Sequence, residues 1–163
     1  MLLLAALLAL RLLPVSPAAP NRQPQLAAAN GTVALAFGSG DSIWLAHSAD
    51  NGRTFGAPSK VAELPKMLLG RHRGPRVAIS GNTILVSAIA TGSDLFYWRS
   101  TDGGKTWSQP AVLNDQPTAA REGLHEMVAD AQGHGSATRS FSPSGRATAR
   151  ISGPEPLHQE HRN

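Results

Sequence analysis

An eight-residue stretch occurs twice in this chain, 52 residues apart. SADNGRTF covers residues 48–55 and STDGGKTW covers residues 100–107. Both copies keep serine, aspartate, glycine, threonine and a closing aromatic residue at the same positions. This repetition predicts a fold in which the same local structure occurs at two equivalent positions.

The similarity between the two halves extends beyond the eight residues. Pro58 and Pro110 follow the two copies at the same offset, and Val61 and Leu113 supply an apolar residue after each proline. The repeated unit is therefore about 50 residues long, a period typical of propeller blades and related repeat architectures. A third unit is expected to begin within residues 125–133.

Short apolar or alternating runs flank both copies, and each run predicts a β-strand. The predicted strands are Leu26–Ala29, Thr32–Phe37, Ile43–Ala46, Val77–Ser80, Thr83–Ile89 and Leu95–Arg99. The connections NG, GSGD, SGN and TGSD have the turn chemistry of antiparallel strands. A chain of 163 residues with 16 glycines, 12 prolines and only 16% charged residues fits about one all-β domain with many tight turns.

The repeated stretch itself is interpreted as a turn between strands. Asp50 and Asp102 are placed to accept backbone N–H groups across the turn, and Gly52 and Gly104 allow positive φ at little steric cost. The threonine that follows starts the next strand, and the closing ring folds back under the turn. The residues with this structural role are Ser48, Asp50, Gly52, Thr54, Phe55, Ser100, Asp102, Gly104, Thr106 and Trp107.

The pattern S-x-D-x-G-x-T-[FW] resembles the Asp-box, or BNR repeat, of sialidases and of related non-enzymatic propellers. The resemblance covers roughly Ala27–Gly133 and implies a β-propeller built from four-stranded antiparallel blades. It also implies that the two boxes lie at the periphery, away from any substrate. About two blades and the start of a third are expected in this chain, whereas the smallest propellers have about four.

The resemblance further implies a small set of candidate substrate residues. Sialidases hold an anionic sugar carboxylate with three arginines, and the segment Arg73–Pro75 resembles the R-I-P motif that supplies one of them, with glycine in place of isoleucine. Arg71 and Arg76 compete with Arg73 for this role, since each guanidinium can pair with a carboxylate in a bidentate way. The alternative interpretation of this basic cluster is an exposed, solvated loop.

The catalytic residues of the family match this chain only in part. Asp94 lies in the loop region that carries the acid/base, and its alternative is a simple turn aspartate. Tyr97 is the only tyrosine, but it lies in a predicted strand, whereas the family's tyrosine nucleophile comes late in the chain. We therefore expect a sialidase-like, glycan-recognising propeller fragment that does not hydrolyse alone; the alternative is a non-catalytic BNR-repeat binding or scaffold module.

The composition argues against cysteine chemistry, metal or cofactor binding, and nucleic-acid binding. The chain has no cysteine, which excludes disulfides, thiolate zinc sites and cysteine nucleophiles. Its histidines lack metal-ligand spacing, so neither a metal nor another cofactor is expected. The net charge of +4 comes from scattered basic residues without interleaved aromatics, which argues against a nucleic-acid partner.

The two ends of the chain differ from its middle. Residues 1–20 resemble a signal peptide, which predicts export to the periplasm or outside the cell and no membrane span after its removal; a buried or mis-started N-terminus is the alternative. Residues 21–133 are assigned to the blades. Residues 134–163 lose the apolar alternation and are predicted to be a disordered or out-of-family tail, either from an interrupted reading frame or as a genuine flexible segment.

The open strand edges of a partial propeller also predict self-association of the chain.

Overall fold

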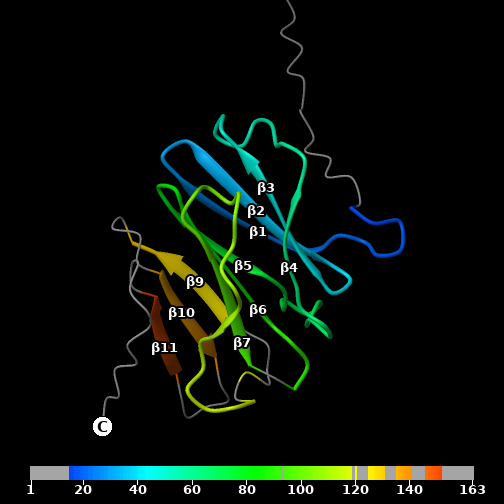
Figure 1. Ribbon diagram of the computed structural model, residues 1–163, viewed down its shortest axis with the longest axis vertical. Helices are drawn as coiled ribbons and strands as arrows, with labels where there is room; N and C mark the ends of the chain where they lie inside the picture. The colour runs from blue at the N-terminus through cyan, green and yellow to red at the C-terminus, as the bar shows by residue number, and fades with distance from the viewer. Residues whose placement is uncertain are drawn as a thin grey trace, which may run out of the picture.

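The computed structural model describes residues 15–92, 94–118, 120, 125–130, 135–140 and 146–151. Within these residues the chain forms eleven strands in three antiparallel sheets (Figure 1). No helix in this part of the chain is long and apolar enough to cross a membrane. The predicted fold class, all-β with two four-stranded antiparallel sheets, is confirmed.

Each sheet follows the order of its strands along the chain. The first sheet contains β1 (Arg22–Ala29), β2 (Thr32–Ser39), β3 (Ser42–Ser48) and β4 (Ser59–Glu63). The second contains β5 (Arg76–Ser80), β6 (Thr83–Ile89), β7 (Leu95–Ser100) and β8 (Ala111–Val112). The third contains β9 (His125–Ala129), β10 (Gly135–Ser140) and β11 (Arg146–Ile151).

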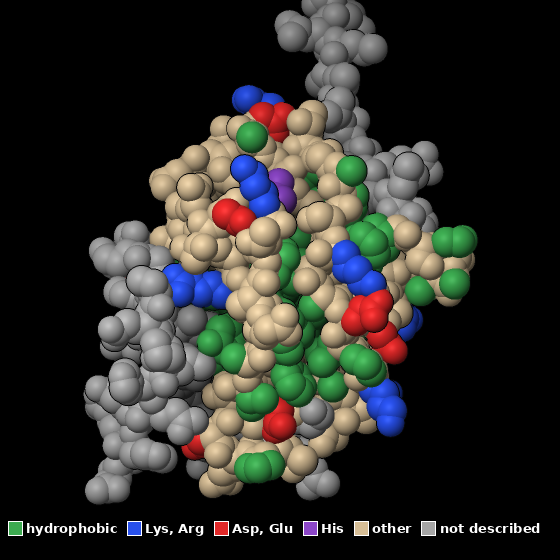
Figure 2. Space-filling model, in the orientation of Figure 1, with side chains coloured by type: hydrophobic (Ala, Val, Ile, Leu, Met, Phe, Trp, Pro, Cys, Tyr) green, Lys and Arg blue, Asp and Glu red, His purple; other side chains and the backbone are tan. Residues whose placement is uncertain are grey.

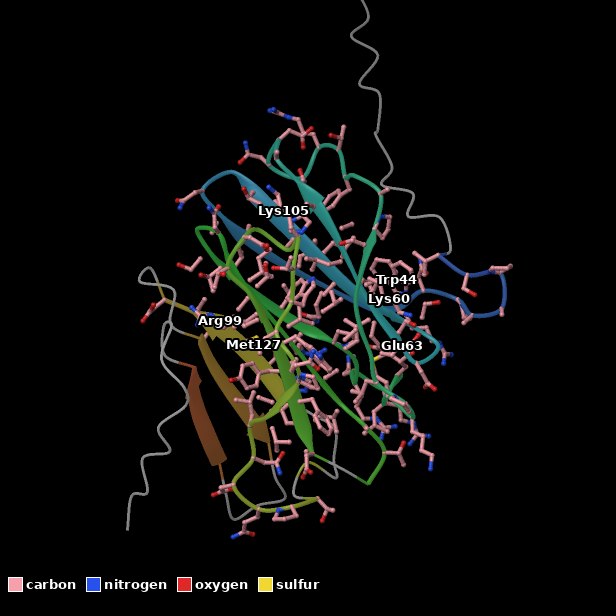
Figure 3. The ribbon with its side chains drawn as sticks, viewed as in Figure 1. Trp44, Lys60, Glu63, Arg99, Lys105 and Met127 are labelled. Carbon is pink, nitrogen blue, oxygen red and sulfur yellow. The ribbon has the colours of Figure 1, made fainter. Side chains whose placement is uncertain are left out.

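The six strands expected from the sequence correspond to β1, β2, β3, β5, β6 and β7, with ends that differ by up to four residues. A strand was expected to start at the threonine of each repeated turn, Thr54 or Thr106, but β4 and β8 begin later, at Ser59 and Ala111. In β4 only Val61 is buried, and β8 has only two residues, so the alternating apolar signal is weak in both strands. Lys60 and Glu63 form an ion pair along β4 and add to its polar character (Figure 3).

The third sheet departs from the predicted tail. Strand β9 begins at His125, where a third unit was expected, but β10 and β11 fall within the segment that was predicted to be disordered. These strands pair with each other and with β9 through continuous antiparallel registers. Backbone pairing satisfies main-chain donors and acceptors whatever the side chains are, so low apolar content did not exclude strands. The remaining residues of that segment lie outside the described residues.

Residues 1–14 of the predicted signal peptide also lie outside the described residues. Of the residues that follow, Val15 and Ala19 contact the first sheet. Val15 packs on the cluster of Leu35, Phe37 and Ala46, and the Ser39 hydroxyl donates a hydrogen bond of 2.8 Å to the Ala19 carbonyl.

The sheets pack face to face through two apolar clusters. Residues of the first and second sheets share the larger cluster, which includes Ile43, Leu45, Ile84 and Trp98. Met127 of β9 joins the second sheet in a further cluster (Figure 3). Strand β5 lies beside both β1 and β9, so the first strands of the three sheets are neighbours (Figure 1). On the face shown in Figure 2, apolar side chains gather in the centre and in the lower part of the molecule.

Candidate functional site

The first copy of the repeated stretch forms a closed hydrogen-bonded turn after β3. The Asp50 carboxylate accepts hydrogen bonds from the Ser48 hydroxyl (2.6 Å), the Thr54 amide (2.9 Å) and the Thr54 hydroxyl (2.6 Å). The Gly52 amide donates to the Ser48 hydroxyl at 2.8 Å, and Gly52 has a φ of 83°. The Ser48 hydroxyl, followed by the hydroxyl and amide of Thr54, holds the pKa of Asp50 well below its usual range.

The second copy builds the same turn after β7. Asp102 accepts hydrogen bonds from the Ser100 hydroxyl (2.7 Å) and from the amide (3.0 Å) and hydroxyl (2.6 Å) of Thr106. Gly104 donates its amide to the Ser100 hydroxyl at 2.8 Å and has a φ of 86°. The hydroxyl of Thr106, with its amide and the Ser100 hydroxyl, holds the pKa of Asp102 well below its usual range. Both carboxylates therefore accept hydrogen bonds within their own turns.

The candidate substrate arginines lie on a tight loop before β5, residues 70–75, which we call the arginine loop. Gly70 and Arg73 exchange backbone hydrogen bonds of 3.1 and 3.0 Å, and the Arg73 Nε also donates to the Gly70 carbonyl at 3.2 Å. Arg71 and His72 are exposed at the tip. The loop has φ values of 128° at Gly70, 49° at Arg71, 65° at His72 and 155° at Gly74.

The arginine loop lies directly against the start of β1. A Cβ atom at Gly74 would lie 2.4 Å from the Cβ of Gln23, a contact too short for any side chain. Gln23 itself has a φ of 52° and lies at an irregularity in the pairing of β1 with β2, between Arg22 and Gln25. Glycine at position 74 therefore allows the two backbones to meet.

Arg76, the first residue of β5, is buried with 4% of its surface exposed. Its guanidinium donates to four backbone carbonyls: those of His72 (2.6 Å), Pro75 (3.2 Å), Gly74 (3.4 Å) and, from β9, His125 (3.0 Å). This arrangement places Arg76 inside the fold, where it joins the arginine loop to the third sheet. On this loop Arg71 is thus exposed and Arg73 half-buried, whereas the Arg76 side chain lies inside the fold.

His125 closes the contact between the second and third sheets. Its Nε2 lies 2.9 Å from the Ser87 hydroxyl, and its buried Nδ1 has no hydrogen-bond partner among the described residues. Burial, with a smaller contribution from the Arg76 charge, lowers the pKa of His125 to about 3. The imidazole is therefore neutral at physiological pH. Glu126, which is largely exposed, has Oε1 3.6 Å from the Arg76 Nε.

Asp94 lies in the loop between β6 and β7 and is engaged by neighbouring groups. Its Oδ1 accepts hydrogen bonds from the Asn114 side chain (2.7 Å) and the Thr118 amide (2.6 Å). Backbone hydrogen bonds tie this loop to the segment that precedes the arginine loop, from Leu68 to Ile89 and from Thr91 to Lys66. Asp94 therefore lies at the same end of the second sheet as the arginines, and its carboxylate braces the connection after β8.

Tyr97 is half-buried within β7 and packs beside the cluster that contains Met127. Burial raises the pKa of its phenol. This position agrees with its predicted place within a sheet.

Sequence reasoning did not assign a role to Gln23 or recognise Arg76 as an internal tether. The signal for Arg76 was its position directly before the apolar run Val77–Ile79, which is buried. Among the described residues no group of three or more histidine, cysteine, aspartate or glutamate side chains could hold a metal ion.

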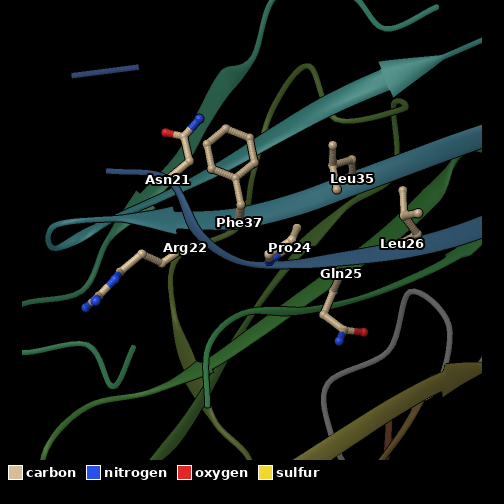
Figure 4. Close-up of a pocket in the computed structure, with 7 residues that line it drawn as sticks. All are labelled: Asn21, Arg22, Pro24, Gln25, Leu26, Leu35 and Phe37. Carbon is tan, nitrogen blue, oxygen red and sulfur yellow. The ribbon is translucent and has the colours of Figure 1, made fainter. Parts of the chain in front are cut away.

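A separate hollow of about 410 Å³ opens on the first sheet (Figure 4). Leu26, Leu35 and Phe37 point to one side of the sheet there, and Gln25 points to the other (Figure 4). Leu35 and Phe37 alternate along β2 with Ala34 and Ala36, which face the second sheet. The hollow therefore lies on the face of the first sheet that the second sheet does not cover. Its lining residues are Asn21, Arg22, Pro24, Gln25, Leu26, Leu35 and Phe37.

Comparison with known proteins supports the fold. No family model matches the sequence, and no curated protein matches it. Among solved structures, the K499G mutant of NanB sialidase from Streptococcus pneumoniae superposes with a TM-score of 0.56 at 16% identity, over 78% of this chain and 20% of that chain. NanB bound to 2-[(3-chlorobenzyl)ammonio]ethanesulfonate gives 0.55 at 15% identity, over 80% and 20%. This chain thus has a sialidase-like fold and spans about a fifth of the length of those structures.

Proposed function

We propose that this chain is a glycan-recognising part of a sialidase-like β-propeller and that its arginine loop binds an anionic sugar. One observation carries the proposal: Arg71 and Arg73 lie on a tight loop at the point where the starts of β1, β5 and β9 meet. Arg71 is exposed and Arg73 is half-buried, so both guanidinium groups can reach a carboxylate from the solvent side. The two repeated turns are Asp-boxes in this proposal and lie outside the binding site.

Binding without hydrolysis suits the residues of this chain best. The Asp94 Oδ1 accepts hydrogen bonds from the Asn114 side chain and the Thr118 amide, so this oxygen is engaged by the segment that follows β8. Tyr97 packs within a sheet instead of lying on a loop. These two positions favour the alternative of a non-catalytic BNR-repeat module over an active hydrolase fragment.

The binding proposal is tested by NMR titration of the chain with N-acetylneuraminic acid at millimolar concentration. Amide shifts are expected to concentrate in the arginine loop. Replacing Arg73→Gln is expected to weaken binding about 10-fold, since a charge-assisted bidentate pair is lost. Arg53→Gln changes an exposed arginine of the first repeated turn and is the matched control. Absence of shifts, or equal weakening by both variants, would overturn the proposal.

Hydrolysis is tested separately with a fluorogenic sialoside. No turnover is expected from this chain. Turnover that Asp94→Asn abolishes would instead show that Asp94 acts as the acid, and the binding-only interpretation would be discarded.

Export and self-association complete the proposal. A signal peptide in residues 1–20 directs the chain out of the cytoplasm, and open strand edges favour pairing between copies. Fractionation of expressing cells and sedimentation of the purified chain test these two points; cytoplasmic retention would contradict the first and a strict monomer the second.

A further inference from the structure

We propose that Arg76 is a positioning residue that holds the arginine loop in its binding shape and couples that loop to the docking of β9. The ligand half of this inference rests on the proposed function, whereas the structural half does not. Arg76 itself does not face the ligand, because its guanidinium is buried and bonded to backbone carbonyls.

Arg76 holds the backbone of the arginine loop. Three of its four carbonyl partners belong to the arginine loop, at His72, Gly74 and Pro75. A guanidinium has five N–H donors in a rigid planar fork and can serve all of them at once. A lysine ammonium is a single point of donation, so Arg76→Lys retains the charge and loses the geometry.

The arginine loop has a backbone conformation that needs support from its surroundings. Arg71 and His72 both adopt positive φ, which non-glycine residues disfavour. Such a conformation persists only where surrounding contacts over-determine it. The bond from Arg76 Nη2 to the His72 carbonyl, at 2.6 Å, acts directly on one of these two residues. Without it, the loop is expected to relax and the directions of the flanking Arg71 and Arg73 to change.

Arg76 also connects the arginine loop to the third sheet. The Arg76 Nε donates to the His125 carbonyl at 3.0 Å, and the same histidine is held from β6 by Ser87 at 2.9 Å. Met127, two residues further along β9, packs in the cluster with Leu85 and Ile89. Displacing β9 therefore removes one of the Arg76 contacts, and loosening the loop removes the others. Because coupling between two sites is reciprocal, a ligand on the arginine loop stabilises the docked position of β9.

Amide hydrogen exchange measured by NMR tests the structural half. In Arg76→Gln, exchange is expected to accelerate about 10-fold or more at Gly70 and Arg73 and throughout β9, with little change in β2 and β3; Arg76→Lys should behave similarly. Arg53→Gln should change neither region. Faster exchange in the loop alone would refute the coupling. Equally faster exchange in all sheets would show that Arg76 stabilises the whole fold without coupling the loop to β9, and would also overturn the inference.

A second variant approaches the same coupling from the other side. Ser87→Ala removes the hydroxyl that holds His125 and keeps the backbone of Ser87, which pairs with Arg76 across β5 and β6. If Arg76 transmits the position of β9, this variant accelerates exchange at Gly70 and Arg73 several-fold. Unchanged exchange at these two amides, with faster exchange in β9, would overturn the inference even if the Arg76 variants fail to fold.

The ligand half uses N-acetylneuraminic acid as the probe. It is expected to slow exchange in β9, and Arg76→Gln is expected to weaken its binding about 10-fold although the side chain does not reach the solvent. If the unmodified chain does not bind the probe, the proposed function fails and the exchange experiments still decide the coupling. If the probe binds but neither protects β9 nor responds to Arg76→Gln, the inference fails and the proposed function stands.

Discussion

The two repeated turns share the hydrogen bonds among serine, aspartate, glycine and threonine, but their surroundings differ. Around Gly52 the nearest contact for an added Cβ is a Val33 methyl at 3.6 Å, whereas at Gly104 it is the His47 ring, with Nε2 at 2.7 Å. Phe55 packs on the face of the first sheet that lies away from the second, and Trp107 packs on the core shared by these two sheets. The sequence of the turn therefore determines its local form, while its place among the sheets determines how much stability depends on it.

The aromatic residues should show this difference most strongly. Trp107→Ala is expected to lower the free energy of unfolding by about 3 kcal/mol, because it removes a large ring from the shared core. Phe55→Ala should cost about 1–2 kcal/mol, since its ring covers a smaller, outer cluster. Urea denaturation of both variants measures the two losses, and equal losses would break the comparison.

Two glycine variants measure how the surroundings of the two turns differ. Gly52→Ala and Gly104→Ala both place a side chain at positive φ, at a cost of about 1 kcal/mol each. Gly104→Ala also meets the His47 ring and is expected to cost about 1 kcal/mol more. Adding His47→Ala should recover that extra part in a double-mutant cycle, and full additivity would show that the contact has no energetic weight.

Acid should act on the contacts between sheets before it acts on the turns. The folded-state pKa of His125 lies at about 3, below the value of 6.5 expected when unfolded, so stability is complete above pH 6.5 and falls as the pH drops toward 3. The loss at pH 5 is about 2 kcal/mol from this group. Burial also lowers the pKa of His47, which adds a loss of the same sign. Unfolding measured at pH 7 and pH 5 should differ less in His125→Gln; an unchanged difference would contradict this assignment.

The smallest contrast is expected for the aspartates. Asp50→Asn and Asp102→Asn should lower the melting temperature by similar amounts, because both carboxylates bond only within their own turns. Their folded-state pKa values lie below the unfolded value of 3.8, so their contribution is present above about pH 4 and is lost as the pH falls through the range below it. Calorimetry of both variants at pH 7 checks the equality; a clearly larger effect at Asp102 would show that its carboxylate also supports the contact between sheets.

The sequence predicted the parts of the fold that depend on local chemistry. The turns and the buried central strands, such as Thr83–Ile89, followed from residue types at close spacing. The start of the outer strand β8 was misplaced because this strand has only two residues and receives its pairing from β7. The arginines were located in one cluster, but their separation into exposed Arg71 and buried Arg76 depends on β9, which is 49 residues away in the sequence. Contacts of that range leave no local pattern to read.

The contact between Gly104 and His47 tests most directly the claim that the second turn is built into the preceding sheet. A nuclear Overhauser spectrum of the isotope-labelled chain is expected to show a cross-peak between the Gly104 Hα protons and the His47 ring, together with one between Gly52 and a Val33 methyl. Both cross-peaks would establish two equal turns in unequal surroundings. A Gly52 to Val33 cross-peak without any contact between Gly104 and His47 would show that the two sheets do not pack as described, and the account of the two turns would fail.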